Sequence, residues 1–294
     1  MAEQECMNEQ QWLAENDDPG RMLNLIHSRW IESAYNGVSP RKLRLFVAAA
    51  CRDSVSRTHG PEIRALAALE TLADEGPGDA ELAVSQAWGP GTIRFPSPGI
   101  AIGTMAGAWA HAQLMVEPPM SKGHRIFRCS ALRCIFGNPC RPLPLWRQET
   151  PAGLGPIGDW KTSWLAWNDG AVRKMAEEIY GGEEICIFCD GSGLDLLKSC
   201  DCCEGSGKVA APFQSHLLPL LADELERAGC DDAAILDHCR NWDLMPCPTV
   251  CKKVNGTYRV ASGEICPTCQ GSSGGVPAPH VRGCWVVDLI LGKA

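Results

Sequence analysis

The sequence predicts a mainly α-helical protein, in which a multi-helix framework is interrupted by two small four-cysteine zinc-knuckle insertions. Three observations support this. Apolar residues recur every three to four positions along much of the chain, whereas the strict alternation typical of half-buried strands is almost absent. Proline and glycine stand where helices would begin and end. Eight of the 17 cysteines occur in closely spaced pairs between residues 186 and 269.

The composition is that of an ordinary globular protein. A chain of 294 residues can form one large domain or two smaller ones with a substantial core. The net charge of −8 disfavours nucleic acid as the partner, because phosphate binding needs a basic surface. The first residues, MAEQECMNEQ, show no secretory signal, so we expect a cytoplasmic protein whose cysteines are thiols and metal ligands rather than disulfides.

One apolar run raises the question of a membrane span. Residues 99–116 consist largely of small and apolar side chains, and Gly99, Gly103 and Gly107 are four positions apart, as in paired membrane helices. The same run carries His111 and Gln113. We therefore expect a buried helix packed through its small face, and no association with a membrane.

The first 140 residues form an N-terminal helical region. From Pro40, the pattern places Leu43, Phe46, Val47, Ala50 and Cys51 on one face of a helix that could stop at Gly60. Pro61 then begins a second helix that ends at Gly76. Further helices are expected over 79–88, 100–116 and 122–136. A loop rich in proline, glycine and tryptophan follows over 141–162.

Residues 163–294 form a C-terminal helical region with two interruptions, a first insertion over 185–209 and a second insertion over 241–279. Helices are expected over 172–180, from about 213 to Gly229, and after a cap at Asp231. The last segment, HVRGCWVVDLILGKA, fits either a helix or a strand. If the two central helices form an antiparallel hairpin, the two insertions lie close together at its open end.

Three tryptophans, Trp160, Trp164 and Trp167, precede the helix over 172–180. Their spacings of four and three residues predict packing in a core. An exposed aromatic patch for a partner is the alternative.

The first insertion contains the phrase Cys-x-x-Cys-x-Gly-Ser-Gly twice, fourteen residues apart. A Cys-x-x-Cys turn brings two thiolates to one point, and zinc prefers four such ligands in a tetrahedron. The following glycines let the backbone turn tightly and turn its N–H groups toward the sulfur atoms. We therefore predict one zinc site built from Cys186, Cys189, Cys200 and Cys203.

The second insertion contains two further pairs, which predict a second zinc site and hence two zinc ions per chain. These pairs are Cys247 with Cys251 and Cys266 with Cys269, and the first of them has three intervening residues instead of two. If the two insertions are neighbours, the pairs could also combine in a crossed order. Redox disulfides and an iron–sulfur cluster are the alternative uses of such thiols.

The remaining cysteines are scattered, and most of them are expected to be small core residues. Cys202 lies between two predicted ligands and is expected to be a bystander. His238 and His280 flank the second insertion, and we expect neither to be a ligand because four thiols are already at hand there.

The two phrases CIFCDGSG and CDCCEGSG, with CPTCQGSSG further on, resemble the repeat of the DnaJ-type cysteine-rich zinc finger over residues 186–271. The resemblance implies two zinc ions and a role in binding unfolded chains and partner chaperones. The His-Pro-Asp triplet of a J domain does not occur in the sequence, so the resemblance extends only to the binding role of the finger.

The rest of the chain resembles a large family of uncharacterised bacterial proteins. The resemblance rests on phrases such as SPRKLRLFVAAACR, ALRCIFGNPCRPLPL, LLADELERAGCDDAAILDHCR and HVRGCWVVDLILGK. In that family the helix ending near Arg240 runs almost directly into the segment beginning at His280. Here residues 241–279 intervene, so both cysteine-rich segments look like insertions into a helical framework.

The sequence therefore predicts a non-catalytic zinc-binding protein that mediates protein interactions. In the chaperone-like form of this prediction, the partner is an unfolded polypeptide. No phosphate-binding loop, nucleophile elbow or zincin motif occurs, so we expect no catalysis. A thiol-redox enzyme using its Cys-x-x-Cys pairs is one alternative. Nucleic-acid binding through the second insertion, with Lys252, Lys253, Tyr258 and Arg259, is the other.

Overall fold

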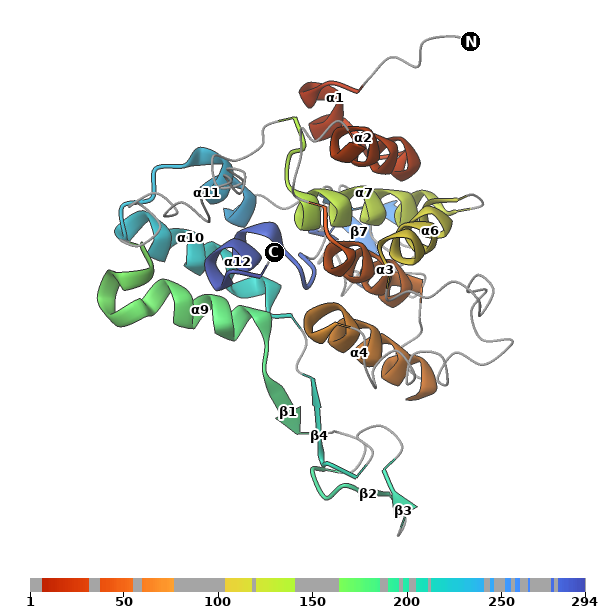
Figure 1. Cartoon of the computed structure of the whole chain (residues 1–294), viewed down its shortest axis with the longest axis vertical. Coiled ribbons are helices and arrows are strands. Elements are labelled where there is room, and N and C mark those ends of the chain that lie inside the picture. The colour runs from red at the N-terminus through yellow and green to blue at the C-terminus, as the bar shows by residue number, and fades with distance from the viewer. Residues whose placement is uncertain are drawn as a thin grey trace.

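The chain folds into a helical framework from which short pairs of strands extend (Figure 1). The computed structural model describes residues 7–31, 38–54, 60–76, 104–117, 120–140, 164–185, 190–195, 198–200, 205–210, 213–240, 244–245, 252–254, 257–259, 264, 276–277 and 280–293. Helices dominate these residues, which confirms the predicted mainly α class. The helix predicted over 79–88 and the loop predicted over 141–162 lie outside them.

The first part of the framework is built around one central helix, α3. Its helices are α1 (Glu9–Ala14), α2 (Pro19–Ile31), α3 (Pro40–Ser54), α4 (Gly60–Glu75), α6 (Met105–Val116) and α7 (Lys122–Phe136). The central helix packs against α4, α6 and α7. Buried side chains of all six helices, including Trp12, Phe46 and Leu132, form the first core.

Helix α3 is buried more completely than its periodicity predicts. The five residues expected on its inner face, Leu43, Phe46, Val47, Ala50 and Cys51, are all buried. So are Lys42 and Arg44, which the pattern places elsewhere on the helix. Neighbouring helices cover α3 on several sides, so a single apolar stripe could not reveal its full burial.

The second part of the framework contains the helices that follow Trp164. They are η2 (Trp167–Gly170), α9 (Ala171–Tyr180), η3 (Ser215–Leu217), α10 (Leu218–Arg227), α11 (Ala233–Arg240) and α12 (Trp285–Leu291). Helix α9 packs against α10 and α12, and α10 packs against α11. Their buried residues form the second core, which also takes in Cys134 from the end of α7.

The structure corrects one local expectation and decides one open alternative. The cap of α11 is Asp232 and not Asp231, because Asp232 Oδ1 accepts the N–H of Ala234 at 2.9 Å and that of Ile235 at 3.3 Å. The final apolar segment is a helix, α12, whose N-terminal neighbour is Cys284 and whose C-terminal neighbour is Gly292.

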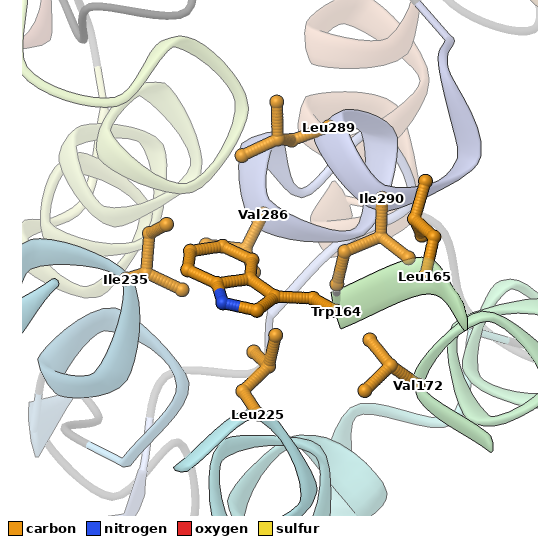
Figure 2. Close-up of a pocket in the computed structure, with 8 residues that line it drawn as sticks. All are labelled: Trp164, Leu165, Val172, Leu225, Ile235, Val286, Leu289 and Ile290. Atoms are coloured by element: carbon orange, nitrogen blue, oxygen red, sulfur yellow. The ribbon is translucent and has the colours of Figure 1, made fainter. Parts of the chain in front are cut away.

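Trp164 packs inside the second core, as its spacing predicts. Its indole projects among aliphatic side chains from α9, α10, α11 and α12 (Figure 2). The small pocket around it is lined by Trp164, Leu165, Val172, Leu225, Ile235, Val286, Leu289 and Ile290, all apolar. Trp167 is 40% exposed and donates its Nε1–H to Glu224 Oε1 at 3.1 Å. Trp160 lies outside the described residues.

A polar junction joins the two parts of the framework. Arg41 of α3 donates to Asp288 of α12 at 2.6 Å, to Asp74 of α4 at 2.9 Å and to the Tyr180 hydroxyl of α9 at 2.7 Å. Tyr180 donates its own proton to Asp74 at 2.6 Å. Because Asp288 is only 2% exposed, this pairing satisfies a charge that burial would otherwise penalise. The junction therefore fixes α12 against α3 and α4.

Each insertion is held by short antiparallel strand pairs. In the first insertion, β1 (Glu183–Ile185) pairs with β4 (Lys208–Ala210), and β2 (Leu194–Asp195) pairs with β3 (Lys198–Ser199). In the second, β5 (Leu244–Met245) pairs with β8 (Val276–Pro277), and β6 (Lys252–Val254) pairs with β7 (Thr257–Arg259). The β1–β4 and β5–β8 pairs bring the two ends of each insertion together.

The expectation that the two insertions lie close together can be compared only with the short strands that the structure describes in each of them. Helices α10 and α11 do pack together. However, β1 and β4 project from one end of the framework, whereas β7 lies behind α7 toward the other end (Figure 1). The described strands β1 and β4 thus lie apart from β7, whereas seven of the eight predicted ligands lie outside the described residues.

Among the described helices, none combines the length and the hydropathy that a bilayer crossing requires. The part of the 99–116 run that the structure describes as a helix is α6, with 12 residues. Its Ala108 and Ala112 lie buried in the first core, as expected for packing through small side chains.

Candidate metal centre

The first insertion brings its two Gly-Ser-Gly segments face to face. A Cβ atom added to Gly193 would collide with the carbonyl oxygen of Gly205, and one added to Gly207 would collide with that of Gly191. All four glycines have positive φ values, between 73° and 85°. Only glycine combines such a backbone with so close an approach. The contacts are reciprocal, so the two half-sites are related by an approximate local twofold.

Cys200 is the predicted ligand of the first insertion that the structure describes. It is 1% exposed and follows β3 directly. Its N–H donates to the carbonyl oxygen of Gly193 at 2.8 Å, which places the second half-site against the turn that ends the first. Cys186, Cys189 and Cys203, together with Cys202, lie outside the described residues.

This arrangement suits four thiolates that come from the two half-sites of one insertion. The β1–β4 pair aligns Ile185 with Lys208, so the chain enters and leaves the insertion at neighbouring points. The facing Gly-Ser-Gly turns, each of which follows a Cys-x-x-Cys segment in the sequence, pack against each other. These features favour the sequential ligand order over the crossed one.

The second insertion is described only in part. Cys247, Cys251, Cys266 and Cys269, the predicted ligands, all lie outside the described residues. The ladder between β6 and β7 pairs Lys252 with Arg259 and Lys253 with Tyr258. The residues of the nucleic-acid alternative are thus close in the backbone, and their ligand-binding role stays a prediction.

A different metal-binding group lies in the framework itself. Cys134 at the end of α7, His238 near the end of α11, His280 after the second insertion and Cys284 before α12 come together there. Their ligand atoms all lie within 4.8 Å of one another, so this Cys/His group could hold a metal ion.

The Cys/His group has contacts close to those of a tetrahedral site. Sγ of Cys134 lies 3.4 Å from Nδ1 of His280, and Sγ of Cys284 lies 3.3 Å from Nε2 of His238. A tetrahedral zinc ion with bonds of about 2.3 Å to sulfur and about 2.0 Å to nitrogen would place such atoms about 3.5 Å apart. These two sulfur–nitrogen distances therefore already match the spacing around one tetrahedral ion.

The four side chains are held by the packing of the second core. Cys134, His280 and Cys284 are 3%, 8% and 0% exposed, and His238 is half-buried. The rings of His238 and His280 meet edge to face, with centroids 4.7 Å apart. The ring of His238 also lies 5.2 Å from that of Trp285, measured between centroids. Such packing limits how far the imidazoles can turn.

The two thiols of the group differ in their protonation. Burial raises the pKa of Cys134 well above its ordinary value, and the hydrogen bond and charge of Cys284 raise it further. Burial also acts to raise the pKa of Cys284, but the Cys134 hydrogen bond and the neighbouring His238 and His280 bring it well below its ordinary value. One thiolate is thus already favoured, and thiolate is the form that binds a metal.

Cys134 and Cys284 are buried in the second core, as expected for most of the scattered cysteines. The group makes both of them candidate metal ligands as well, together with His238 and His280, which the sequence had not suggested as ligands. Sequence patterns for zinc sites identify pairs of ligands that are close together in the chain, whereas Cys134 and His280 are 146 residues apart. One local indication was present, because His280 and Cys284 are four residues apart in a segment that leads into a helix.

Comparisons with protein-family models, curated proteins and solved structures found no match.

Proposed function

We propose that this chain is a non-catalytic zinc-binding protein whose first insertion presents a rigid zinc knuckle to a protein partner. The observation that carries the proposal is the facing pair of Gly-Ser-Gly turns, in which Gly193 and Gly207 each leave no room for a side chain. Zinc at the four predicted cysteines would hold these turns together. A closed four-thiolate site leaves no coordination position for a substrate.

The position of the first insertion supports a binding role. Its β1–β4 pair leads away from the helices, so the knuckle stands clear of the framework (Figure 1). The chain carries a net charge of −8, which favours a protein partner over nucleic acid. The resemblance to the DnaJ-type finger adds unfolded polypeptide as the partner to test first. The second insertion would carry the second zinc ion.

A direct test uses a permanently unfolded probe, such as reduced and carboxymethylated α-lactalbumin with a fluorescent label. Zinc-loaded protein is expected to raise the anisotropy of the probe in a saturable way. Cys200→Ser should lose the knuckle's zinc and most of this binding, because three thiolates cannot close the site. Cys230→Ser is the matched control, since Cys230 is buried in the second core away from the insertion.

Three results would overturn the proposal. Equal binding by the wild-type protein and Cys200→Ser would show that the knuckle is not the binding element. Binding of a labelled oligonucleotide that falls with salt, without binding of the unfolded probe, would favour the nucleic-acid alternative. Reduction of insulin disulfides that Cys200→Ser abolishes would favour a thiol-redox enzyme. Helix content from circular dichroism confirms that each variant is folded.

A further inference from the structure

We propose that the Cys/His group binds one zinc ion in a closed structural site that belongs to the helical framework and is additional to the sites predicted in the two insertions. Two thiols and two imidazoles make up the donor set. Zinc is the metal that such a tetrahedral sulfur–nitrogen set suits best among common biological ions. The inference does not depend on the cysteines of either insertion.

The structure needs little rearrangement to accept the ion. The two sulfur–nitrogen contacts of 3.4 and 3.3 Å are already those of a tetrahedron around zinc. The widest separation among the four donor atoms is 4.8 Å or less, so only a small contraction is required.

The site would be structural and not catalytic. Four protein ligands complete the tetrahedral coordination of zinc, so no position remains for water. Cys284 has no exposed surface and Cys134 is 3% exposed, so solvent reaches the group poorly. The energy of metal binding would then appear as stability of the fold.

The ion would join parts of the chain that are far apart in sequence. Cys134 lies on α7, most of whose buried residues belong to the first core, whereas His238 and Cys284 adjoin helices of the second core. His238 and His280 stand on either side of the second insertion, and β5 with β8 pairs its two ends. One ion would thus fix α12 and both ends of the second insertion to α7.

The test uses the full chain with all predicted ligands of the insertions changed to serine. These are Cys186, Cys189, Cys200, Cys203, Cys247, Cys251, Cys266 and Cys269. The variant should still bind about one zinc ion per chain, as expected for one closed site with four ligands. Replacement by Co²⁺ should give the intense visible absorption of a tetrahedral centre with thiolate ligands.

Two further substitutions in this background separate a metal site from a merely packed cluster. Cys134→Ser should abolish the cobalt spectrum. Cys239→Ser should keep it, because Cys239 is equally buried and adjoins His238 but lies outside the group. Absence of metal from the folded eight-serine variant would overturn the proposal, as would an unchanged spectrum after Cys134→Ser.

If the eight-serine variant does not fold, the zinc-loaded wild-type chain decides. Its zinc X-ray absorption spectrum should show imidazole nitrogen together with sulfur. A shell of sulfur alone would overturn the proposal and leave the predicted four-cysteine sites in place.

Discussion

At the scale of single residues, Arg41 organises the buried charges between the two parts of the framework. It binds two carboxylates and the Tyr180 hydroxyl at the same time. The ring of Tyr180 also lies under two more cations, with Arg282 at 4.6 Å and Lys293 at 3.9 Å from its centroid. A phenol in this position serves both as a hydrogen-bond relay and as a cation–π surface.

Tyr180→Phe keeps the aromatic ring but removes the hydroxyl that links Arg41 to Asp74. Asp74 then loses a donor and Arg41 loses an acceptor, both in a half-buried place. We expect the free energy of unfolding to fall by about 1.5–3 kcal/mol, as for hydrogen bonds to charged groups. Urea unfolding measures it. The control is Arg173→Ala, which breaks only the exposed ion pair with Glu177 and should change the free energy of unfolding by less than about 0.5 kcal/mol. Equal losses of stability in both variants would contradict the role of the Tyr180 hydroxyl.

Gly193→Ala tests the close approach of the two half-sites. The new methyl group would meet the Gly205 carbonyl at a φ of +73°, so the backbone strain of about 1–2 kcal/mol adds to a collision. We expect the variant to lose about one zinc ion per chain, the content of one four-ligand site. Gly182→Ala, where nothing lies within 4 Å of the added atom, is the control. Full zinc content in Gly193→Ala would show that the facing turns are not needed.

Cys51 gives a pH-dependent prediction. Burial raises the pKa of its thiol from 9.0 to about 12. The folded state therefore keeps a proton that the unfolded state releases, and this contribution to stability is present below pH 9 and lost as the pH rises from 9 to 12.

Unfolding of wild-type protein and of Cys51→Ala across that range measures the effect. The free energy of unfolding of the wild type should fall with pH more steeply than that of Cys51→Ala, by about 1.4 kcal/mol per pH unit. The reason is that the wild type releases one more proton when it unfolds. Between pH 7 and 8 the two curves should run parallel. Parallel curves up to pH 12 would contradict the assignment.

At the scale of elements, α11 depends on its first residues for its position and carries His238 near its end. Asp232→Ala removes the cap that accepts the N–H groups of Ala234 and Ile235. The free energy of unfolding should fall by about 0.5–2 kcal/mol. Asp231→Ala, at the exposed neighbouring position, should change it by less than about 0.5 kcal/mol. The reverse order in urea unfolding would assign the cap to Asp231 after all.

The helices could be predicted from the sequence because each amphipathic segment shows helical periodicity and is followed by residues that end a helix. The helix expected over 122–136 is α7 over the same residues, and the stripe from Val172 to Tyr180 is the buried face of α9. The choice between Asp231 and Asp232 could not be predicted, because both can cap and only the backbone path decides.

The Cys/His group could not be predicted from the sequence for a related reason. Its ligands come from three segments, and nothing local in α7 marks Cys134 as different from its neighbour Cys129. Only the packing of α7 against the region before α12 brings Cys134 to His280. The paired cysteines of the insertions were easier to recognise, because their spacing alone brings two sulfur atoms together.

At the scale of the whole molecule, two hydrophobic cores share one boundary, and two polar features cross it. The junction around Arg41 joins α3 and α4 to α9 and α12. The Cys/His group joins the end of α7 to α11 and to the start of α12. Each insertion has its two ends joined by its own strand pair, so we expect the framework to stay helical if the metal predicted in an insertion is removed (Figure 1).

The central claim is that zinc holds this protein in its binding-competent form. Native mass spectrometry of the wild-type chain, purified under reducing conditions, tests it most directly. The account predicts a mass that exceeds that of the bare chain by about three zinc ions, one for each set of four ligands. A folded chain at the mass of the bare polypeptide would contradict the account.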